Sequence, residues 1–387
     1  MIVREGSVHV PRAHVHERKS KMKLNWAKTW AIVVVTVVVV TMSARAQGTT
    51  YSVAILGDTH YDAEPESIYH SHYGESNKLA KVQHTEFRRN GEMWRGRCRD
   101  LVAASARLAR EMPTDFVLQT GDLVQGDCDD VPTHLRMLGD CIGVMRANYP
   151  TGLPFLTVAG NHDLRGKGAR SAYFAFAERH LAKELGKPVA YPVFSTVWGG
   201  DLWVFCYFGI KDLSPLLEAV SERTDVRHTF VVTHGPFTPS ECHYSAWRLA
   251  GSRGCDEQRL KLYELLSRRH AIVLSGHTHE TAWFRHENEF GGFAEFTANS
   301  VWKAPELATA EPVGEGAAAY GKWAAATLTE AQKAEFNAAA AAFRPGLKDY
   351  YMSLGAGHAR LNVSETDVTV DYYPGATNVP VRTFRMK

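Results

Sequence analysis

The sequence predicts an α/β fold, built as one large domain with an insertion. Short apolar runs of strand length alternate with segments of helical periodicity, which is typical of an α/β chain. No stretch has the composition of a linker between domains, and 387 residues are enough to bury a sizeable core. The overall composition, 45% hydrophobic and 22% charged, is that of a globular protein.

The first half of the chain follows this alternation closely. Apolar runs predict strands at residues 51–57, 115–120 and 154–159. Helical periodicity predicts helices at residues 94–110, 132–147 and 171–182. Residues 62–92 are polar and rich in histidine. We interpret them as a connection in which His70, His72 and His84 are solvated loop residues, with a substrate role as the alternative.

The second half continues in the same style and then changes. Strands are predicted at residues 193–197, 202–208, 229–233 and 271–275, with further short strands in 281–299. Helices are predicted from Asp212 to about residue 221 and at 256–269. Residues 303–350 are rich in alanine and predict a helical, lid-like insertion. Closing strands at 358–363, 367–373 and 379–386, within residues 355–387, are expected to return to the core formed by residues 50–300.

Residues 1–46 are expected to be a secretory signal peptide. A basic stretch precedes an apolar run at residues 31–42, and Ala44-Arg45-Ala46 then gives a small-residue cleavage pattern before Gln47. A membrane anchor is the alternative, but the run has 12 residues, and a spanning helix needs about 20. The basic stretch is long for a signal, so Met22 is a candidate for the true start. The pattern predicts a secreted or periplasmic protein cleaved near Ala46/Gln47.

Charge and cysteine content add to this interpretation. The formal net charge is +2, but residues 1–46 carry eight Lys/Arg against two Glu, so the remainder is slightly acidic. A slightly acidic body argues against nucleic-acid binding. Six cysteines in an exported chain suggest disulfides, and we expect the pairs Cys128–Cys141 and Cys242–Cys255. Cys206 is expected as a buried thiol, and Cys98 then has no obvious partner.

Five segments place metal-binding side chains directly after a predicted strand. They are Asp58-Thr59-His60, Gly121-Asp122, Gly160-Asn161-His162-Asp163, Thr233-His234-Gly235 and Gly276-His277-Thr278-His279. Strand ends are where α/β folds gather functional groups, so residues remote in sequence can meet there. A single Asp or His at such a place is usually a cap or a core residue. That explanation fails for the seven candidate ligands taken together, which are Asp58, His60, Asp122, Asn161, His234, His277 and His279.

The types of ligand indicate the kind of metal site. Carboxylate, imidazole and amide groups suit Zn, Mn or Fe, and the lack of cysteine disfavours a structural zinc site. Seven ligands are too many for one tetrahedral ion. A shared carboxylate could bridge two ions, as in two-metal hydrolysis.

The ordered series D-x-H, GD, GNH(D/E), H and GHxH resembles that of the calcineurin-like metallophosphoesterase family, over about residues 52–300. The resemblance implies a two-sheet β-sandwich flanked by helices, with the site at one end. It implies that Asp58, His60 and His279 hold one metal ion and that Asn161, His234 and His277 hold a second. By the same resemblance, Asp122 bridges the two ions, and His162 stabilises or protonates the leaving group. Asp163 is expected either to orient His162 or to cap the following turn.

Departures from the family pattern argue against two branches of the family. Gln125 stands where purple acid phosphatases have a tyrosine and protein Ser/Thr phosphatases an aspartate, and Ala159 precedes Gly160 where the latter have an arginine. The sequence therefore resembles the secreted metallophosphatases and phosphodiesterases. Arg165 could reach a phosphate, but we expect an exposed loop arginine.

The resemblance implies an exported enzyme that hydrolyses phosphate monoesters by attack of a hydroxide bridging two divalent or trivalent ions (Fe, Zn or Mn). The alternatives are a phosphodiesterase acting on cyclic nucleotides or phospholipid headgroups, and a non-catalytic binding module on the same fold. The expected partner is a small phosphorylated substrate, with no nucleic acid and no stable membrane span after signal cleavage. The sequence leaves the substrate, the metals and the oligomeric state open.

Overall fold

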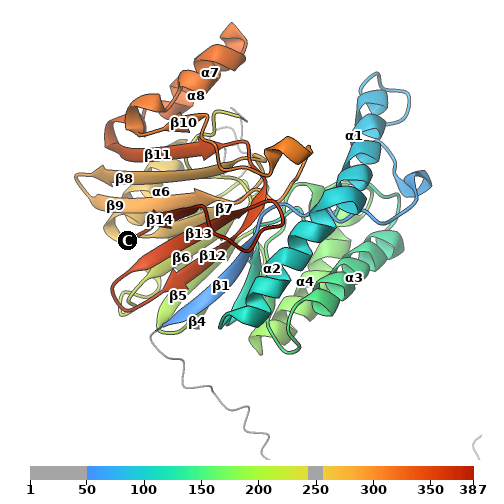
Figure 1. Cartoon of the computed structure of the whole chain (residues 1–387), viewed down its shortest axis with the longest axis horizontal. Coiled ribbons are helices and arrows are strands. Elements are labelled where there is room, and N and C mark those ends of the chain that lie inside the picture. The colour runs from blue at the N-terminus through green and yellow to red at the C-terminus, as the bar shows by residue number, and fades with distance from the viewer. Residues whose placement is uncertain (1–49, 243–255) are drawn as a thin grey trace, which may run out of the picture. The chain divides into compact units, whose positions relative to one another are not determined.

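Two β-sheets lie face to face in the computed structural model, which describes residues 50–242 and 256–387 (Figure 1). One sheet has six strands in the order β14-β13-β12-β1-β2-β3, and the other has eight in the order β10-β11-β8-β9-β7-β6-β5-β4. The strands of the first sheet are β1 (Tyr51–Leu56), β2 (Phe116–Gln119), β3 (Phe155–Thr157), β12 (Gly357–Val363), β13 (Val368–Pro374) and β14 (Arg382–Arg385). Those of the second are β4 (Val193–Trp198), β5 (Asp201–Cys206), β6 (Thr229–Thr233), β7 (Ile272–Ser275), β8 (Thr281–Asn288), β9 (Gly291–Thr297), β10 (Gly314–Glu315) and β11 (Leu347–Ser353).

Each sheet has a parallel centre. β1, β2 and β3 run parallel to one another, and so do β5, β6, β7 and β9. β12 pairs with β1 in antiparallel fashion, with Tyr51 opposite Val363. The parallel strands therefore point their carboxyl ends in one direction within each sheet, and the loops that follow them gather at one edge.

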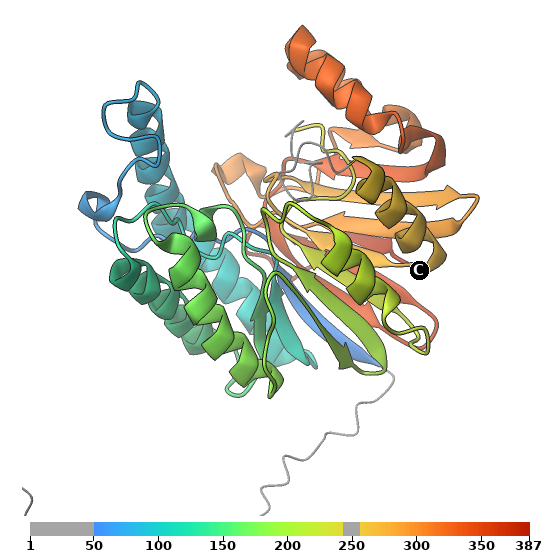
Figure 2. The same ribbon diagram turned by 180° about the vertical axis from the view of Figure 1, so that it is seen from behind.

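Helices cover the outer faces of both sheets, as the two views show (Figures 1 and 2). α2 (Arg99–Glu111), α3 (Val131–Asn148) and α4 (Ala169–Leu185) flank the six-stranded sheet, and α5 (Ser214–Ser221) and α6 (Asp256–Arg268) flank the eight-stranded sheet. Among these helices, α3 begins with a cap in which Asp130 accepts a 2.7 Å hydrogen bond from Thr133 N. The two-sheet sandwich flanked by helices confirms the predicted fold class.

The parallel strands are continuous apolar runs because both of their faces are buried. In β6, Phe230 and Val232 pack into the core between the sheets, whereas Val231 packs into a second core beneath the outer helices. Phe116 of β2 and Trp203 of β5 meet across the sheets with ring centroids 5.1 Å apart. Strands buried on both faces lose the polar alternation of an exposed sheet.

The polar segment at residues 62–92 contains a helix that the sequence did not indicate. α1 (Ala80–Met93) continues through a π-helical turn, η2 (Trp94–Cys98), into α2, and it projects beyond the sheets in Figure 1. Its buried face includes Gln83 and Asn90 as well as Phe87. Because polar residues occupy the buried face, the apolar periodicity that marks a helix is weak there.

The alanine-rich stretch contains helices and also strands. α7 (Lys322–Thr327) and α8 (Glu330–Ala340) lie within it, next to β11 in Figure 1. β10 lies inside the expected stretch of 303–350, and β11 crosses its C-terminal end. Both strands are part of the eight-stranded sheet. Buried Tyr350 and Met352 of β11 pack in a small core with Phe336 of α8.

The expected disulfide Cys128–Cys141 is wrong, because both thiols are free and buried. Cys128 Sγ lies 3.3 Å from His134 Nδ1, and Cys141 Sγ lies 3.7 Å from the carbonyl oxygen of Leu123. Cys206 is a buried free thiol, as predicted, and Cys98 is also buried and free. The pair Cys242–Cys255 includes a residue outside the described ranges and stays a prediction.

The expected signal peptide, residues 1–46, also lies outside the described residues. Among the helices formed by residues 50–242 and 256–387, none is both long enough and apolar enough to cross a membrane.

Candidate metal centre

Loops from both sheets bring the seven predicted ligands together. Asp58 and His60 follow β1, Asp122 follows β2 and Asn161 follows β3, while His234 follows β6. His277 and His279 follow β7. The carboxyl ends of the parallel strands of two sheets thus open onto one space, where three overlapping groups of His and Asp residues could each hold a metal ion.

The backbone at this place is unusual. His60, Asp122, His277 and His279 all have positive φ, at 42°, 53°, 73° and 55°. Side chains other than glycine rarely adopt this left-handed conformation, and it costs free energy. Four such residues in one small region indicate that the fold holds them there against their local preference.

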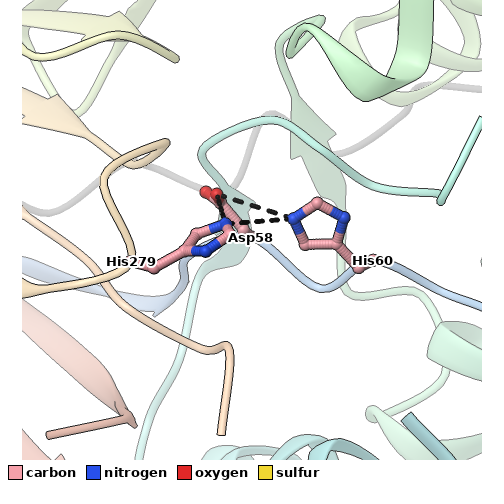
Figure 3. A group of neighbouring side chains, drawn as sticks. All are labelled: Asp58, His60 and His279. Carbon is pink, nitrogen blue, oxygen red and sulfur yellow. Dashed lines mark hydrogen bonds and ion pairs between the residues drawn. The ribbon is translucent and has the colours of Figure 1, made fainter. Parts of the chain in front are cut away.

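The first group consists of Asp58, His60 and His279 (Figure 3). Asp58 Oδ2 lies 3.0 Å from His279 Nε2 and 3.9 Å from His60 Nε2. The two imidazole nitrogens are themselves 3.1 Å apart. Three ligand atoms therefore point at one another, as they would around a shared cation.

The second group is arranged around His234, which is fully buried. His234 Nε2 lies 3.1 Å from Asn161 Oδ1, 3.1 Å from His277 Nδ1 and 3.2 Å from Asp122 Oδ2. Asp122 Oδ2 is also 3.6 Å from His60 Nε2 of the first group. Asp122 is thus the carboxylate that lies between the two groups.

Hydrogen bonds to backbone groups turn these side chains toward one another. Asp58 Oδ1 accepts from His277 N at 2.8 Å, and Asp122 Oδ1 accepts from His162 N at 2.7 Å. Each carboxylate therefore directs its other oxygen, Oδ2, into the site. His234 Nδ1 donates to the carbonyl oxygen of Thr120 at 2.9 Å, which turns Nε2 into the site. This set of oxygen and imidazole ligands fits divalent metal ions.

Burial and neighbouring charges oppose each other at the carboxylates. Burial acts to raise the pKa of Asp58 and Asp122, but nearby histidines, His234 first, hold both pKa values below the usual range. Burial lowers the pKa of His60 to about 4. For His234 burial is outweighed by the charges of Asp122 and Asp58, which raise its pKa to about 9. Both carboxylates stay ionised at neutral pH, so a bound cation can replace the proton on His234.

Two glycines of the motifs allow this close packing. A Cβ atom at Gly160 would lie 2.2 Å from Asp122 Oδ1, and one at Gly276 would lie 2.4 Å from Asp58 Oδ1. Both distances are shorter than any real contact of a Cβ atom. Glycine is needed at these positions because each carboxylate touches the backbone of the neighbouring loop.

His162 forms the third group, with His60 and Asp122, and lies beside the other two. Its ring packs edge-on against His60, with centroids 4.4 Å apart, and its Nδ1 is 2.9 Å from the carbonyl oxygen of Gln125. Asp163 is buried, and its carboxylate accepts from Val124 N at 3.1 Å and from Gly160 N at 2.8 Å. Gln125 therefore fixes the orientation of the His162 ring, and Asp163 joins two ligand loops through their backbones.

The structure adds two residues that the sequence did not indicate, Phe208 and Glu86, and it shows the contacts of three that were considered, Arg165, His72 and His84. The ring of Phe208, after β5, lies 5.2 Å from that of His277, measured between centroids. Glu86 of α1 and Arg165 both lie beside His162, at 3.5 Å and 2.5 Å from its Nε2. His72 lies in an exposed turn, as expected, and its Nδ1 also contacts Asp127 at 2.8 Å. His84 is not a loop residue, because it lies on α1, beside Glu75. These side chains belong to no short motif, and only tertiary contacts reveal them.

Residues 51–281, more than half of the chain, match the family model described as calcineurin-like phosphoesterase. A comparison with curated proteins finds no match. Among solved structures, a purple acid phosphatase from yellow lupin (Lupinus luteus) seeds is 11% identical with a TM-score of 0.49, over 88% of this chain and 54% of that one. The anchor in the inner membrane complex of Plasmodium is 13% identical with a TM-score of 0.47, over 87% and 89%. A dimetal phosphatase from Danio rerio is 10% identical with a TM-score of 0.44, over 87% and 98%. The chain thus spans about half the length of the lupin enzyme.

Proposed function

The chain belongs to the calcineurin-like phosphoesterase family and is a metallophosphoesterase, and we propose that it is an exported enzyme that hydrolyses phosphate monoesters with two bound metal ions. One observation carries the proposal. Seven side chains from five loops of two sheets direct carboxylate, amide and imidazole ligand atoms into a single space. A non-catalytic binding module has no need of such a complete set, which favours catalysis.

The proposed ligands divide as the distances do. Asp58, His60 and His279 would hold one ion, Asn161, His234 and His277 would hold the other, and Asp122 would contact both. The mixture of oxygen and imidazole nitrogen suits Fe, Zn or Mn. When bound, such ions supply Lewis acidity to the phosphoryl oxygens and make water nucleophilic at neutral pH.

His162 is the residue that we assign to the leaving group. A carbonyl oxygen only accepts hydrogen bonds, so the contact with Gln125 requires the proton on Nδ1 and leaves Nε2 to exchange a proton with the substrate. Burial and the charge of Arg165 lower the pKa of His162. An anionic phosphate beside Nε2 acts in the opposite direction and favours protonation when substrate binds. Asp163 supports this arrangement through the loops that it joins.

The test is a comparison of metal-free and metal-restored protein on chromogenic monoesters and diesters. The protein is stripped with a chelator, and its metal content is measured before and after addition of Mn, Zn or Fe. We expect activity to return with the metal and to be greater on 4-nitrophenyl phosphate than on bis(4-nitrophenyl) phosphate. Equal activity with and without metal would contradict the metal-dependent mechanism, and a preference for the diester would replace a phosphatase by a phosphodiesterase.

A matched pair of variants locates the metal. His279→Ala is expected to lower the metal content, because His279 is a proposed ligand. His84→Ala is the control, because that histidine lies on α1, contacts Glu75 at 2.9 Å and is not one of the proposed ligands. Retention of the full metal content by His279→Ala would remove it from the ligand set.

Export is proposed from the order of basic, apolar and small residues at the N-terminus. N-terminal sequencing of the secreted or periplasmic product is expected to begin near Gln47. Recovery only as an uncleaved cytosolic chain that retains residues 31–42 would contradict export.

A further inference from the structure

Arg165 is not the exposed loop arginine that the sequence suggests. It follows the short 3-10 helix η3 (His162–Leu164), and only 18% of its side chain is exposed. Its Nη1 lies 2.5 Å from His162 Nε2, the atom that we assign to the leaving group. Since the His162 ring contacts His60, the guanidinium is one imidazole ring away from the proposed metal ligands.

Asp127 holds this guanidinium from the inner side. Asp127 is fully buried, and its Oδ2 lies 2.8 Å from Arg165 Nη2. The two residues are also joined by a 2.8 Å hydrogen bond from Asp127 N to the carbonyl oxygen of Arg165. The other carboxylate oxygen of Asp127 lies 2.8 Å from His72 Nδ1. The arginine is therefore fixed in both its backbone and its charged end.

The outer side of the guanidinium is held more loosely. Glu86 Oε2 lies 3.6 Å from Arg165 Nη2, and its side chain is 30% exposed. Arg165 Nε is buried and has no hydrogen-bond partner among the described residues, so an anion has to approach from the side of Glu86. A contact at 3.6 Å with a partly exposed carboxylate is weak, so an incoming anion can take its place while the buried pair with Asp127 stays intact.

We propose that Arg165 is a substrate-binding residue that donates to a phosphoryl oxygen, that Asp127 positions it, and that it favours phosphate monoesters over diesters. The inference rests on the proposed function and names the specificity of that site. A monoester presents one more unesterified oxygen, and at neutral pH more negative charge, than a diester. A guanidinium next to His162 can bind that additional oxygen with a charge-assisted hydrogen bond, which a diester cannot accept as well.

The experiment compares Arg165→Gln, Arg165→Lys and Asp127→Asn with the wild-type protein. Hydrogen bonds to charged groups correspond to losses of about 10- to 100-fold, and we expect kcat/KM for 4-nitrophenyl phosphate to fall by this factor in Arg165→Gln. The fall for bis(4-nitrophenyl) phosphate is expected to be smaller, and binding of inorganic phosphate, measured by calorimetry, is expected to weaken in parallel with the monoester reaction. Arg165→Lys keeps the positive charge but lacks the planar guanidinium. Its kcat/KM for the monoester is expected to lie between those of the wild type and Arg165→Gln.

Asp127→Asn is expected to raise KM for the monoester more than it lowers kcat. Combined with Arg165→Gln it is expected to add little, because a positioning residue acts through the residue that it holds. Arg146→Gln is the matched control. Arg146 also forms an ion pair, 2.6 Å from Glu184, which in turn binds Phe155 N at the beginning of β3, away from the carboxyl ends of the strands. Its ratio of monoester to diester activity is expected to match that of the wild type.

The outcomes separate this inference from the proposed function. If the metal-loaded wild type hydrolyses neither ester, the proposed function fails, and phosphate binding alone then decides the role of Arg165. If the wild type is active and Arg165→Gln keeps its ratio of monoester to diester activity and its phosphate affinity, Arg165 does not bind substrate. Loss of metal from a folded Arg165→Lys variant would also overturn the inference, because it would place Arg165 in support of the metal ligands.

Discussion

Replacing Gly276 with alanine tests whether close packing between the sheets sets the position of the first metal group. The added Cβ would lie 2.4 Å from Asp58 Oδ1 and 2.6 Å from Thr120 Oγ1. Carbon and oxygen atoms in contact lie about 3.3 Å or more apart, so the carboxylate has to move by about 0.9 Å. That movement disrupts the 2.8 Å hydrogen bond from His277 N to Asp58 Oδ1, which aims the other oxygen at His279.

Two effects of different size follow from this displacement. Overpacking of a well-packed region costs about 1–3 kcal/mol of stability, so the variant is expected to fold with a lowered melting temperature. A displacement of about 1 Å in a catalytic group costs about 100-fold in rate, so the larger effect is expected in kcat/KM. Metal binding by Asp58, His60 and His279 is expected to weaken by about 10- to 100-fold, as when a supporting partner of a ligand is lost.

Metal content after dialysis, thermal unfolding and initial rates on a chromogenic monoester measure these effects together. Gly139→Ala is the control, because Gly139 lies within α3 and a Cβ there meets no atom within 4 Å. It is expected to gain about 0.5–1 kcal/mol of stability, as a helical glycine replaced by alanine does, with unchanged metal content. Wild-type metal content and rate in Gly276→Ala would refute the argument that this glycine allows Asp58 its position.

Other predictions concern the bridging carboxylate, the proposed acid and the response to pH. Asp122→Asn is expected to lower kcat/KM by about 100-fold or more and to weaken the binding of both metal ions. This loss is expected to exceed that of any single substitution within residues 62–92, as measured by kinetics and metal content across a set of variants. His162→Ala is expected to keep its metal and to lose about 100- to 10,000-fold on alkyl phosphates, but far less on nitrophenyl esters; loss of metal, or equal losses on both esters, would contradict the acid role. Burial lowers the pKa of His134 from 6.5 to about 4, so the folded state keeps this histidine neutral while the unfolded state takes up a proton. The free energy of unfolding is therefore expected to fall by about 1.4 kcal/mol per pH unit from this residue as pH drops from about 6.5 to about 4. Urea unfolding of metal-free His134→Gln at several pH values is expected to show a shallower slope, and an unchanged slope would contradict the assignment.

The convergence of the candidate metal ligands could be predicted because each lies directly after a strand. Apolar runs mark strands such as β1 and β6 locally, and parallel strands of one sheet end at one edge whatever the rest of the chain does. Asp58 and His234 are 176 positions apart in sequence, yet their placement depends only on the two strands that precede them and on the packing of the sheets.

Residues whose surroundings come from distant segments could not be predicted in this way. Arg165 looks like a loop arginine because Asp127 and Glu86, which surround it, belong to other loops and to α1. The helix α1 itself was missed because Gln83 and Asn90 lie on its buried face. The predicted disulfide Cys128–Cys141 is wrong for the same reason. The two thiols contact His134 and the carbonyl oxygen of Leu123, and spacing along the chain does not reveal these contacts.

The pairing of β1 with β12 has a consequence for synthesis of the chain on the ribosome. One edge of β1 can pair with β2 soon after both are made, but its other edge waits for β12, which begins at Gly357. At translation rates of about 5–20 residues per second, roughly 15–60 s pass between the synthesis of β1 and the synthesis of β12. During that time an apolar strand, residues 51–56, has an unpaired edge of the kind that recruits other strands. The nascent chain is therefore expected to need protection of this segment, by a chaperone or by delayed folding, until its C-terminal strands emerge.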